Sequence, residues 1–232
     1  MERIGDAFVW PFRDPKWVEK VAIIGLISFI PIIGTINGLG WMLNSLDRLR
    51  EGKHELPPGN FDHLGRGVLL FVVLLVYTLV LVVVCGGVLL AGFMLLSIGG
   101  SHEGNTFVGL IGAAVTLLGF GLIVLATLAL FFARPAIVLA TDRGGVGAGL
   151  DVPAVLRRMR VSPTNTLIAG LMLLAASFIS QLGSYACIVG LIFTIPYALA
   201  IEAWVIRSYE LGSPEPKREE GLDVGHSAAP GR

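Results

Sequence analysis

The fold is decided by residues 67–98, which read GVLLFVVLLVYTLVLVVVCGGVLLAGFMLLSI and contain no charged side chain. At the 1.5 Å rise of an α-helix, these residues extend about 48 Å, which exceeds the roughly 30 Å hydrocarbon core of a bilayer. Runs this long and apolar are typical of membrane-spanning helices, because a helix satisfies its own backbone polar groups where water is absent. We therefore predict a transmembrane helix that tilts, bends near Gly86-Gly87 or protrudes.

Other parts of the chain lack charge in the same way. Residues 21–46 and 161–201 contain no charged residue, and residues 67–133 contain only Glu103. Of the 232 residues, 54% are hydrophobic and 15% are charged, whereas an ordinary soluble domain carries about 25% charged residues. This composition excludes a soluble enzyme, a disordered chain and a disulfide-stapled secreted domain. It predicts an all-α polytopic membrane protein.

Short polar segments divide the apolar runs. The turn GGSHEGNT covers residues 99–106, and the polar break that begins at Gln181 divides a run too long for one span. The predicted full spans are 67–98, 107–132, 166–182 and 185–206. We predict a single helical membrane domain over residues 1–206, followed by a disordered cytoplasmic tail over residues 207–232, which is polar and contains Pro and Gly.

Residues 133–165 are predicted to form the largest polar connection, with a flexible glycine-rich linker at residues 144–149. Asp151 followed by Pro153 is a helix-start signal, so we expect a short helix over about residues 152–161. Its predicted apolar side carries Val152, Val155, Leu156 and Met159, and its other side mostly carries Arg157, Arg158 and Arg160. This pattern is typical of an amphipathic helix at a membrane interface.

The first apolar run, residues 21–46, is interrupted near its middle. Pro31, Gly34, Gly38 and Gly40 crowd into ten residues, and in a helix interior a proline costs about 3 kcal/mol and a glycine about 1 kcal/mol. Two interpretations remain open. The run is either one kinked span or a pair of half-depth helices that enter and leave on the same side, at about residues 15–31 and 34–50.

The basic residues indicate the topology, because short cytoplasmic loops carry an excess of Lys and Arg. Of the 17 basic residues, four lie in residues 1–20, four in 47–66, five in 133–165 and four in the tail. A full crossing by residues 21–46 would leave four outside, whereas a re-entrant hairpin would place all 17 inside. We prefer four full spans plus one re-entrant helical hairpin over five full spans, with both termini on the cytoplasmic side of a prokaryotic inner membrane.

Several motifs in the first third of the chain resemble those of a known family. They are Pro11-Phe12 with Asp14 and Trp17, the break Ile30-Pro31-Ile32-Ile33-Gly34, Gly40 beside an aromatic residue, the stretch from Arg48 to Gly52, and Leu56-Pro57 before Asp62 and Gly67. Together they resemble the opening of an uncharacterised prokaryotic membrane family, domain of unknown function 4013, and the likeness extends over about residues 7–205. Trp41 stands where we expect tyrosine, and Pro58-Gly59 where an acidic or aromatic residue is usual. The resemblance implies an integral membrane protein without an assigned activity, and it assigns no functional residues.

Polar side chains within apolar runs are candidates for ligand or solute binding, because such groups are costly in a membrane. Glu202 is the carboxylate of the last run, Asn37 lies in the break of the first run, and Gln181 lies at the polar turn. Each also has a structural interpretation. Glu202 can pair with a loop arginine or snorkel, Asn37 can satisfy a bend, and Gln181 can hold helices together. Small residues at helical spacing predict close helix packing at Gly34, Gly38, Gly109 and Gly112.

The sequence offers little chemistry beyond these residues. His54, Glu55, Asp62 and His63 share one loop but lack the spacing of a metal motif, so we predict neither a metal nor a cofactor. The membrane runs hold almost no ionisable groups, so we expect no catalysis. The 17 acidic residues balance the 17 basic ones, which argues against nucleic-acid binding.

Two functional hypotheses follow. The first is a non-catalytic membrane component that binds lipid or a partner, either a second copy of the chain or another membrane protein. It would use its small-residue helix faces and its basic cytoplasmic residues. The alternative is a small-solute transporter or channel subunit that acts as an oligomer, since four or five spans make a thin wall around a pore.

Overall fold

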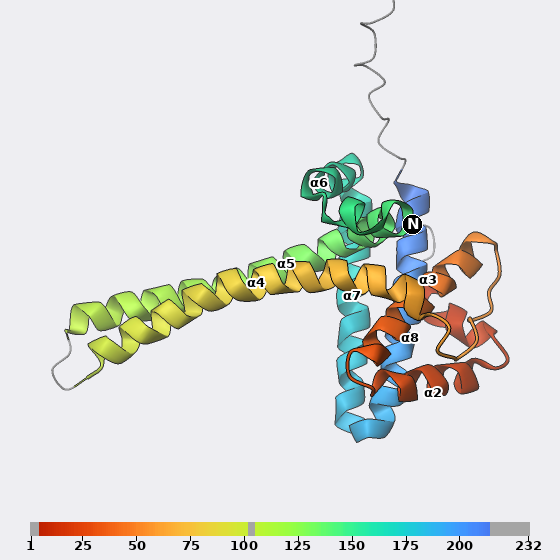
Figure 1. The fold of residues 1–232 in the computed structure, drawn as a ribbon, viewed down its shortest axis with the longest axis horizontal. Helices are drawn as coiled ribbons and strands as arrows, with labels where there is room; N and C mark the ends of the chain where they lie inside the picture. Colours follow the sequence, from red (N-terminus) through yellow and green to blue (C-terminus); the bar gives the residue numbers. More distant parts are fainter. Residues whose placement is uncertain (1–4, 102–104, 214–232) are drawn as a thin grey trace, which may run out of the picture.

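The computed structural model describes residues 5–101 and 105–213, apart from the side chains of residues 186–188. The elements in chain order are α1 (Asp6–Val9), η1 (Trp10–Arg13), α2 (Trp17–Ser28), α3 (Ile33–Arg50), α4 (Leu64–Gly99), α5 (Thr106–Leu150), α6 (Val152–Val161), α7 (Pro163–Leu182), η2 (Gly183–Ala186) and α8 (Cys187–Gly212). Figure 1 shows a long hairpin of α4 and α5 that projects from a body built by the other helices and by the near ends of α4 and α5. We call its outer part, residues 79–101 and 105–126, the arm.

Four helices in the described part of the chain are long and apolar enough to cross a membrane. They are Leu64–Gly99, Thr106–Leu150, Pro163–Tyr185 and Val189–Gly212. The prediction of an all-α protein with four long apolar helices is therefore confirmed. Figure 1 shows that the arm and the α7–α8 pair run in clearly different directions, so the two hairpins cannot both lie along one membrane normal.

The first apolar run is divided into two helices, as its proline and glycines predict. α2 ends at Ser28, α3 begins at Ile33, and Ile32 between them has a φ of 64°. Gly34 allows the two helices to meet closely, because a Cβ at this position would lie 2.2 Å from the carbonyl oxygen of Ile27. The tight break thus depends on a residue without a side chain.

The prediction that the helix ends near residue 132 and gives way to a non-helical polar connection is wrong. α5 continues through Pro135 to Leu150. Residues 135–139 are all buried in the body, so tertiary packing offsets the helix-breaking cost of the proline. The helix is instead interrupted at Gly145, whose φ of 70° and ψ of −163° are not helical. The glycine-rich segment is therefore largely helical.

The short helix expected over residues 152–161 is present as α6. The last helix, by contrast, ends later than expected. α8 extends to Gly212, so residues 207–212 are helical and do not belong to a disordered tail. The rest of the predicted tail, residues 214–232, lies outside the described residues.

The body is held together where α3, α5, α7 and α8 meet. Its core contains Leu46 from α3, Leu139 from α5, Leu173 from α7 and Ile201 from α8, all buried. The N-terminal turns pack on α8. The indole Nε1 of Trp10 donates to the carbonyl oxygen of Ala200 at 3.2 Å. This packing fixes the part of α8 that carries Glu202.

Candidate functional site

A charged pair lies inside the body, between α5 and α8. The Nε of Arg134 lies 2.6 Å from the Oε1 of Glu202. The side chain of Glu202 is 7% exposed and that of Arg134 is 30% exposed. The sequence suggested that Glu202 might pair with a loop arginine, but Arg134 lies within a helix. Helix α5 carries this arginine into the body because the helix does not stop at Pro135.

The pair lines a cavity of about 190 Å³ between α5, α7 and α8. Glu202 and Gln181, two of the three predicted binding residues, both line it. The polar residues of its wall are Arg134, Ser177, Ser180, Gln181 and Glu202. On α7 the lining residues recur at helical spacing from Leu173 to Gln181, so one face of α7 leads from the charged pair toward the α7–α8 turn.

Arg134 also lines a second cavity. It has a volume of about 260 Å³ and is lined by α4 and α5 residues, among them Tyr77, Thr78, Thr127 and Phe131. Arg134 and Phe131 line both cavities. Arg134 therefore borders two spaces that are both largely apolar, and the one on the α7–α8 side also contains Ser177, Ser180, Gln181 and Glu202.

Asn37 is not among the residues that line either cavity. It is fully buried in α3, and its Nδ2 donates to the carbonyl oxygen of Asn60 at 2.9 Å. Its Oδ1 has no hydrogen-bond partner among the described residues. The side chain thus ties α3 to the loop that precedes α4, and this hydrogen bond is not to the break between α2 and α3.

A larger network of charges joins four helices at the end of the body near α6. Arg50 of α3 donates from its Nε and Nη2 to both carboxylate oxygens of Glu210 in α8, at 3.1 and 3.0 Å, and its Nη1 donates to Asp142 of α5 at 2.7 Å. Arg66 of α4 pairs with Asp142 and with Asp47. Arg143 and Arg207 also pair with Glu210. The network thus connects α3, α4, α5 and α8.

Sequence reasoning missed this network. It treated Arg50, Arg66 and Arg143 as basic loop residues that report topology, although their partners were also visible. Asp142 precedes Arg143, and Glu210 lies three residues after Arg207, a spacing at which helical side chains meet. These arginines are engaged within the protein, so they belong to its packing and not to a basic surface.

Asp14 organises the N-terminal region. It is 2% exposed, and it accepts hydrogen bonds from the Nζ of Lys20 at 2.6 Å and from the backbone N–H groups of Lys16 and Leu56, both at 2.8 Å. Burial by itself raises the pKa of Asp14, but these donors outweigh it and hold the pKa below its ordinary value. The carboxylate therefore ties the start of the chain to the loop before α4.

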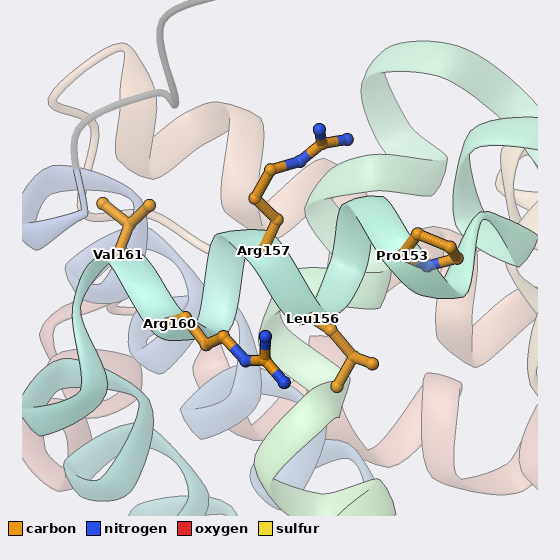
Figure 2. A pocket seen from close by; sticks show the side chains of 5 residues that line it. All are labelled: Pro153, Leu156, Arg157, Arg160 and Val161. Carbon is orange, nitrogen blue, oxygen red and sulfur yellow. The ribbon is translucent and has the colours of Figure 1, made fainter.

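Helix α6 presents a mixed basic and apolar face. Asp151 caps it by accepting from the N–H of Ala154 at 3.1 Å, and Val155 faces the core. A shallow groove of about 580 Å³ is lined by Pro153, Leu156, Arg157, Arg160 and Val161. Figure 2 shows Leu156 and Arg160 on the same side of the helix, whereas Arg157 points away on the other side. The expected separation of apolar and basic sides is therefore incomplete, because Leu156 is exposed beside an arginine.

The glycines predicted to pack helices lie at different kinds of contact. A Cβ on Gly112 would lie 2.4 Å from the backbone nitrogen of Leu96, so α4 and α5 meet closely there. A Cβ on Gly109 would lie 3.5 Å from Gly99, which is an ordinary contact. A Cβ on Gly38 would lie 3.1 Å from the Cδ1 of Leu199. With Gly34 at the α2–α3 break, these positions serve contacts within the chain.

The described residues contain no group of three or more His, Cys, Asp or Glu side chains placed to hold a metal ion. His63 is buried and its ring nitrogens contact Pro58 and Asn44. His63, one of the loop residues that the sequence singled out, thus has structural contacts.

The fold and these sites define a multi-pass helical membrane protein with a charged pair inside its helix bundle. Residues 23–189 match the family described as protein of unknown function (DUF4013), and the chain belongs to this family. The match confirms the resemblance, although it begins after Asp14 and Trp17. No curated protein and no solved structure matches the chain.

Proposed function

We propose that this protein is a non-catalytic membrane component that binds anionic lipid headgroups through α6. The observation that carries the proposal is that each side of α6 pairs an exposed apolar residue with an arginine, Leu156 with Arg160 on one side and Val161 with Arg157 on the other. An exposed surface that combines leucine and arginine is typical of helices that lie in a membrane interface.

The position of α6 supports this role. Only Ser162 separates α6 from α7, which is long and apolar enough to cross a membrane. The groove therefore lies at the level where a span begins. Leucine and valine at this depth can contact acyl chains, while the arginine side chains reach the headgroups.

The two arginines of α6 are also available to bind an external anion. Arg157 and Arg160 form no ion pair with any described residue, unlike Arg50, Arg66, Arg143 and Arg207. A guanidinium binds phosphate through paired N–H donors, and each basic residue near an anionic surface contributes roughly 1 kcal/mol. Two arginines thus favour an anionic phospholipid over a zwitterionic one.

The test is the thermal stability of the detergent-purified protein with added phosphatidylglycerol or phosphatidylcholine. We expect phosphatidylglycerol to raise the unfolding temperature more than phosphatidylcholine does, and we expect Arg157→Gln/Arg160→Gln to remove the difference. Lys16→Gln/Lys53→Gln removes the same charge elsewhere and is the matched control. Equal stabilisation by both lipids, or an unchanged response in the arginine variant, would refute the proposal.

A second candidate function is the binding and passage of a small solute, with the protein acting as an oligomer. The observation that favours it is that Arg134 lines two cavities, one against α4 and one against α7 and α8. An intramembrane charge that borders a cavity is a common feature of solute pathways. Flux of radiolabelled solute into proteoliposomes, compared between the natural protein and Glu202→Gln, tests this function. Flux that is unaltered by the substitution would count against it.

A further inference from the structure

We infer that the cavity beside Arg134 and Glu202 binds a small zwitterion, with one ammonium and one carboxylate group separated by one to three carbon atoms. This inference names the solute class for the second candidate function and rests on the same cavity. It concerns binding alone, so it does not require that the solute crosses the membrane.

The two opposite charges in the cavity wall favour a ligand without net charge. Arg134 and Glu202 are the charged residues of its wall, and they carry opposite signs. An anion or a cation would introduce an unbalanced charge into a largely apolar setting, which is costly. A ligand with one group of each sign keeps the site neutral.

Both residues of the pair retain polar atoms that can bind such a ligand. Arg134 approaches Glu202 most closely through its Nε, and within the described part of the chain its terminal nitrogens donate no hydrogen bond. A guanidinium has five N–H donors in a planar fork, so the terminal nitrogens can hold a carboxylate. The carboxylate of Glu202 meets Arg134 through Oε1, which leaves Oε2 as an acceptor for an ammonium group.

The remaining wall sets the size and contributes neutral hydrogen-bonding groups. A volume of about 190 Å³ equals that of about six water molecules at roughly 30 Å³ each. Ser177, Ser180 and Gln181 continue from the charged pair along one face of α7. These hydroxyl and amide groups allow a polar molecule to approach the pair from the α7–α8 turn.

The experiment is isothermal titration of the full chain in nanodiscs made of phosphatidylcholine. The probes are β-alanine, acetate, methylammonium and glycerol, each at the same concentration and pH. We expect saturable binding of β-alanine and at least tenfold weaker binding of the other three. Acetate or methylammonium binding as strongly as β-alanine would overturn the inference, as would the absence of β-alanine binding.

Three variants separate binding from folding. Arg134→Gln/Glu202→Gln removes both charges without leaving either one unpaired, and it should lose β-alanine binding. Ser180→Leu fills the cavity while it keeps the pair, and it should lose binding as well. Arg157→Gln lies on α6 and should bind as the natural protein does. If both cavity variants bind β-alanine normally, the assigned site is wrong. Binding of β-alanine without flux in proteoliposomes would instead reject transport and leave the inference standing.

Discussion

The arm and the body are both apolar, but they use their apolar side chains in opposite ways. In the most apolar stretches of α4 and α5, 17% and 6% of the residues are buried, against 39% in those of α7 and α8. In the arm, Leu117 is 72% exposed and Phe107 is 67% exposed, whereas Leu139 in the body is completely buried. The same residue types thus face outward in one region and inward in the other.

This difference in burial shows which interactions specify a fold in lipid. Lipid tails are as apolar as leucine, so apolar side chains gain little by leaving lipid for a protein core. The arm therefore needs no further protein around it. The body, in contrast, contains polar contacts that lipid cannot replace, namely the Arg134–Glu202 pair and the network around Arg50.

The largest expected effect is that of breaking the charged pair in the body. Arg134→Gln leaves the buried carboxylate of Glu202 without its partner, which should destabilise the protein by about 3 kcal/mol. The measurement is the unfolding transition in detergent, followed by accessibility of residues in α7 and α8. The double variant Arg134→Gln/Glu202→Gln should recover most of the loss. If the single and double variants are equally stable, the pair does not define the body.

The second largest effect is expected where α4 and α5 meet closely within the arm. Gly112→Ala would place a Cβ 2.4 Å from the backbone nitrogen of Leu96, so α4 and α5 must separate, at a cost of about 1–3 kcal/mol. Gly86→Ala is the matched control because nothing lies within 4 Å of its added Cβ. There the alanine should be neutral or stabilise the helix by up to about 1 kcal/mol. Thermal unfolding of both variants checks this, and a similar loss in both would contradict the close contact.

A smaller effect is expected from the network at the α6 end of the body. A double-mutant cycle with Arg50→Ala and Glu210→Ala should give a coupling of about 1 kcal/mol, since the side chain of Arg50 is 25% exposed and solvent weakens the pair. The cycle of Arg48→Ala and Glu55→Ala is the control, because that pair is 3.9 Å apart and its glutamate is 70% exposed. Equal coupling in the two cycles would mean that the network does not link the helices.

The sequence predicts the arm well and the body less well, for a physical reason. The arm follows from composition, because its residues are almost all apolar and one polar turn separates its two helices. The end of α5 does not, because Pro135 and Arg134 read locally as a helix stop. Only contacts with residues distant in sequence, such as Glu202, keep the helix intact.

The residues of the candidate site could likewise be predicted only in part from the sequence. Glu202 and Gln181 were recognisable as polar residues in an apolar run, but Arg134 was assigned to a loop, so the pair could not be foreseen. Asn37 has the same local signal as Glu202, yet it contacts Asn60 and lines neither cavity. Of the three polar residues, Asn37 and Glu202 are buried and Gln181 is exposed, so tertiary structure decides which of them is buried and which borders a cavity.

The smallest expected effect concerns pH, and it separates the two regions once more. Hydrogen bonds from Lys20 and two backbone N–H groups hold the pKa of Asp14 below its ordinary value of 3.8, against the opposing effect of burial. The resulting stabilisation is complete above pH 3.8 and is lost as the pH falls through the lower pKa of the folded state. Hydrogen exchange should then show the N–H of Leu56 losing protection below pH 3.8, while amides of the arm keep theirs. Asp14→Asn should abolish this acid dependence, and a loss of protection that begins above pH 3.8 would assign it to another group.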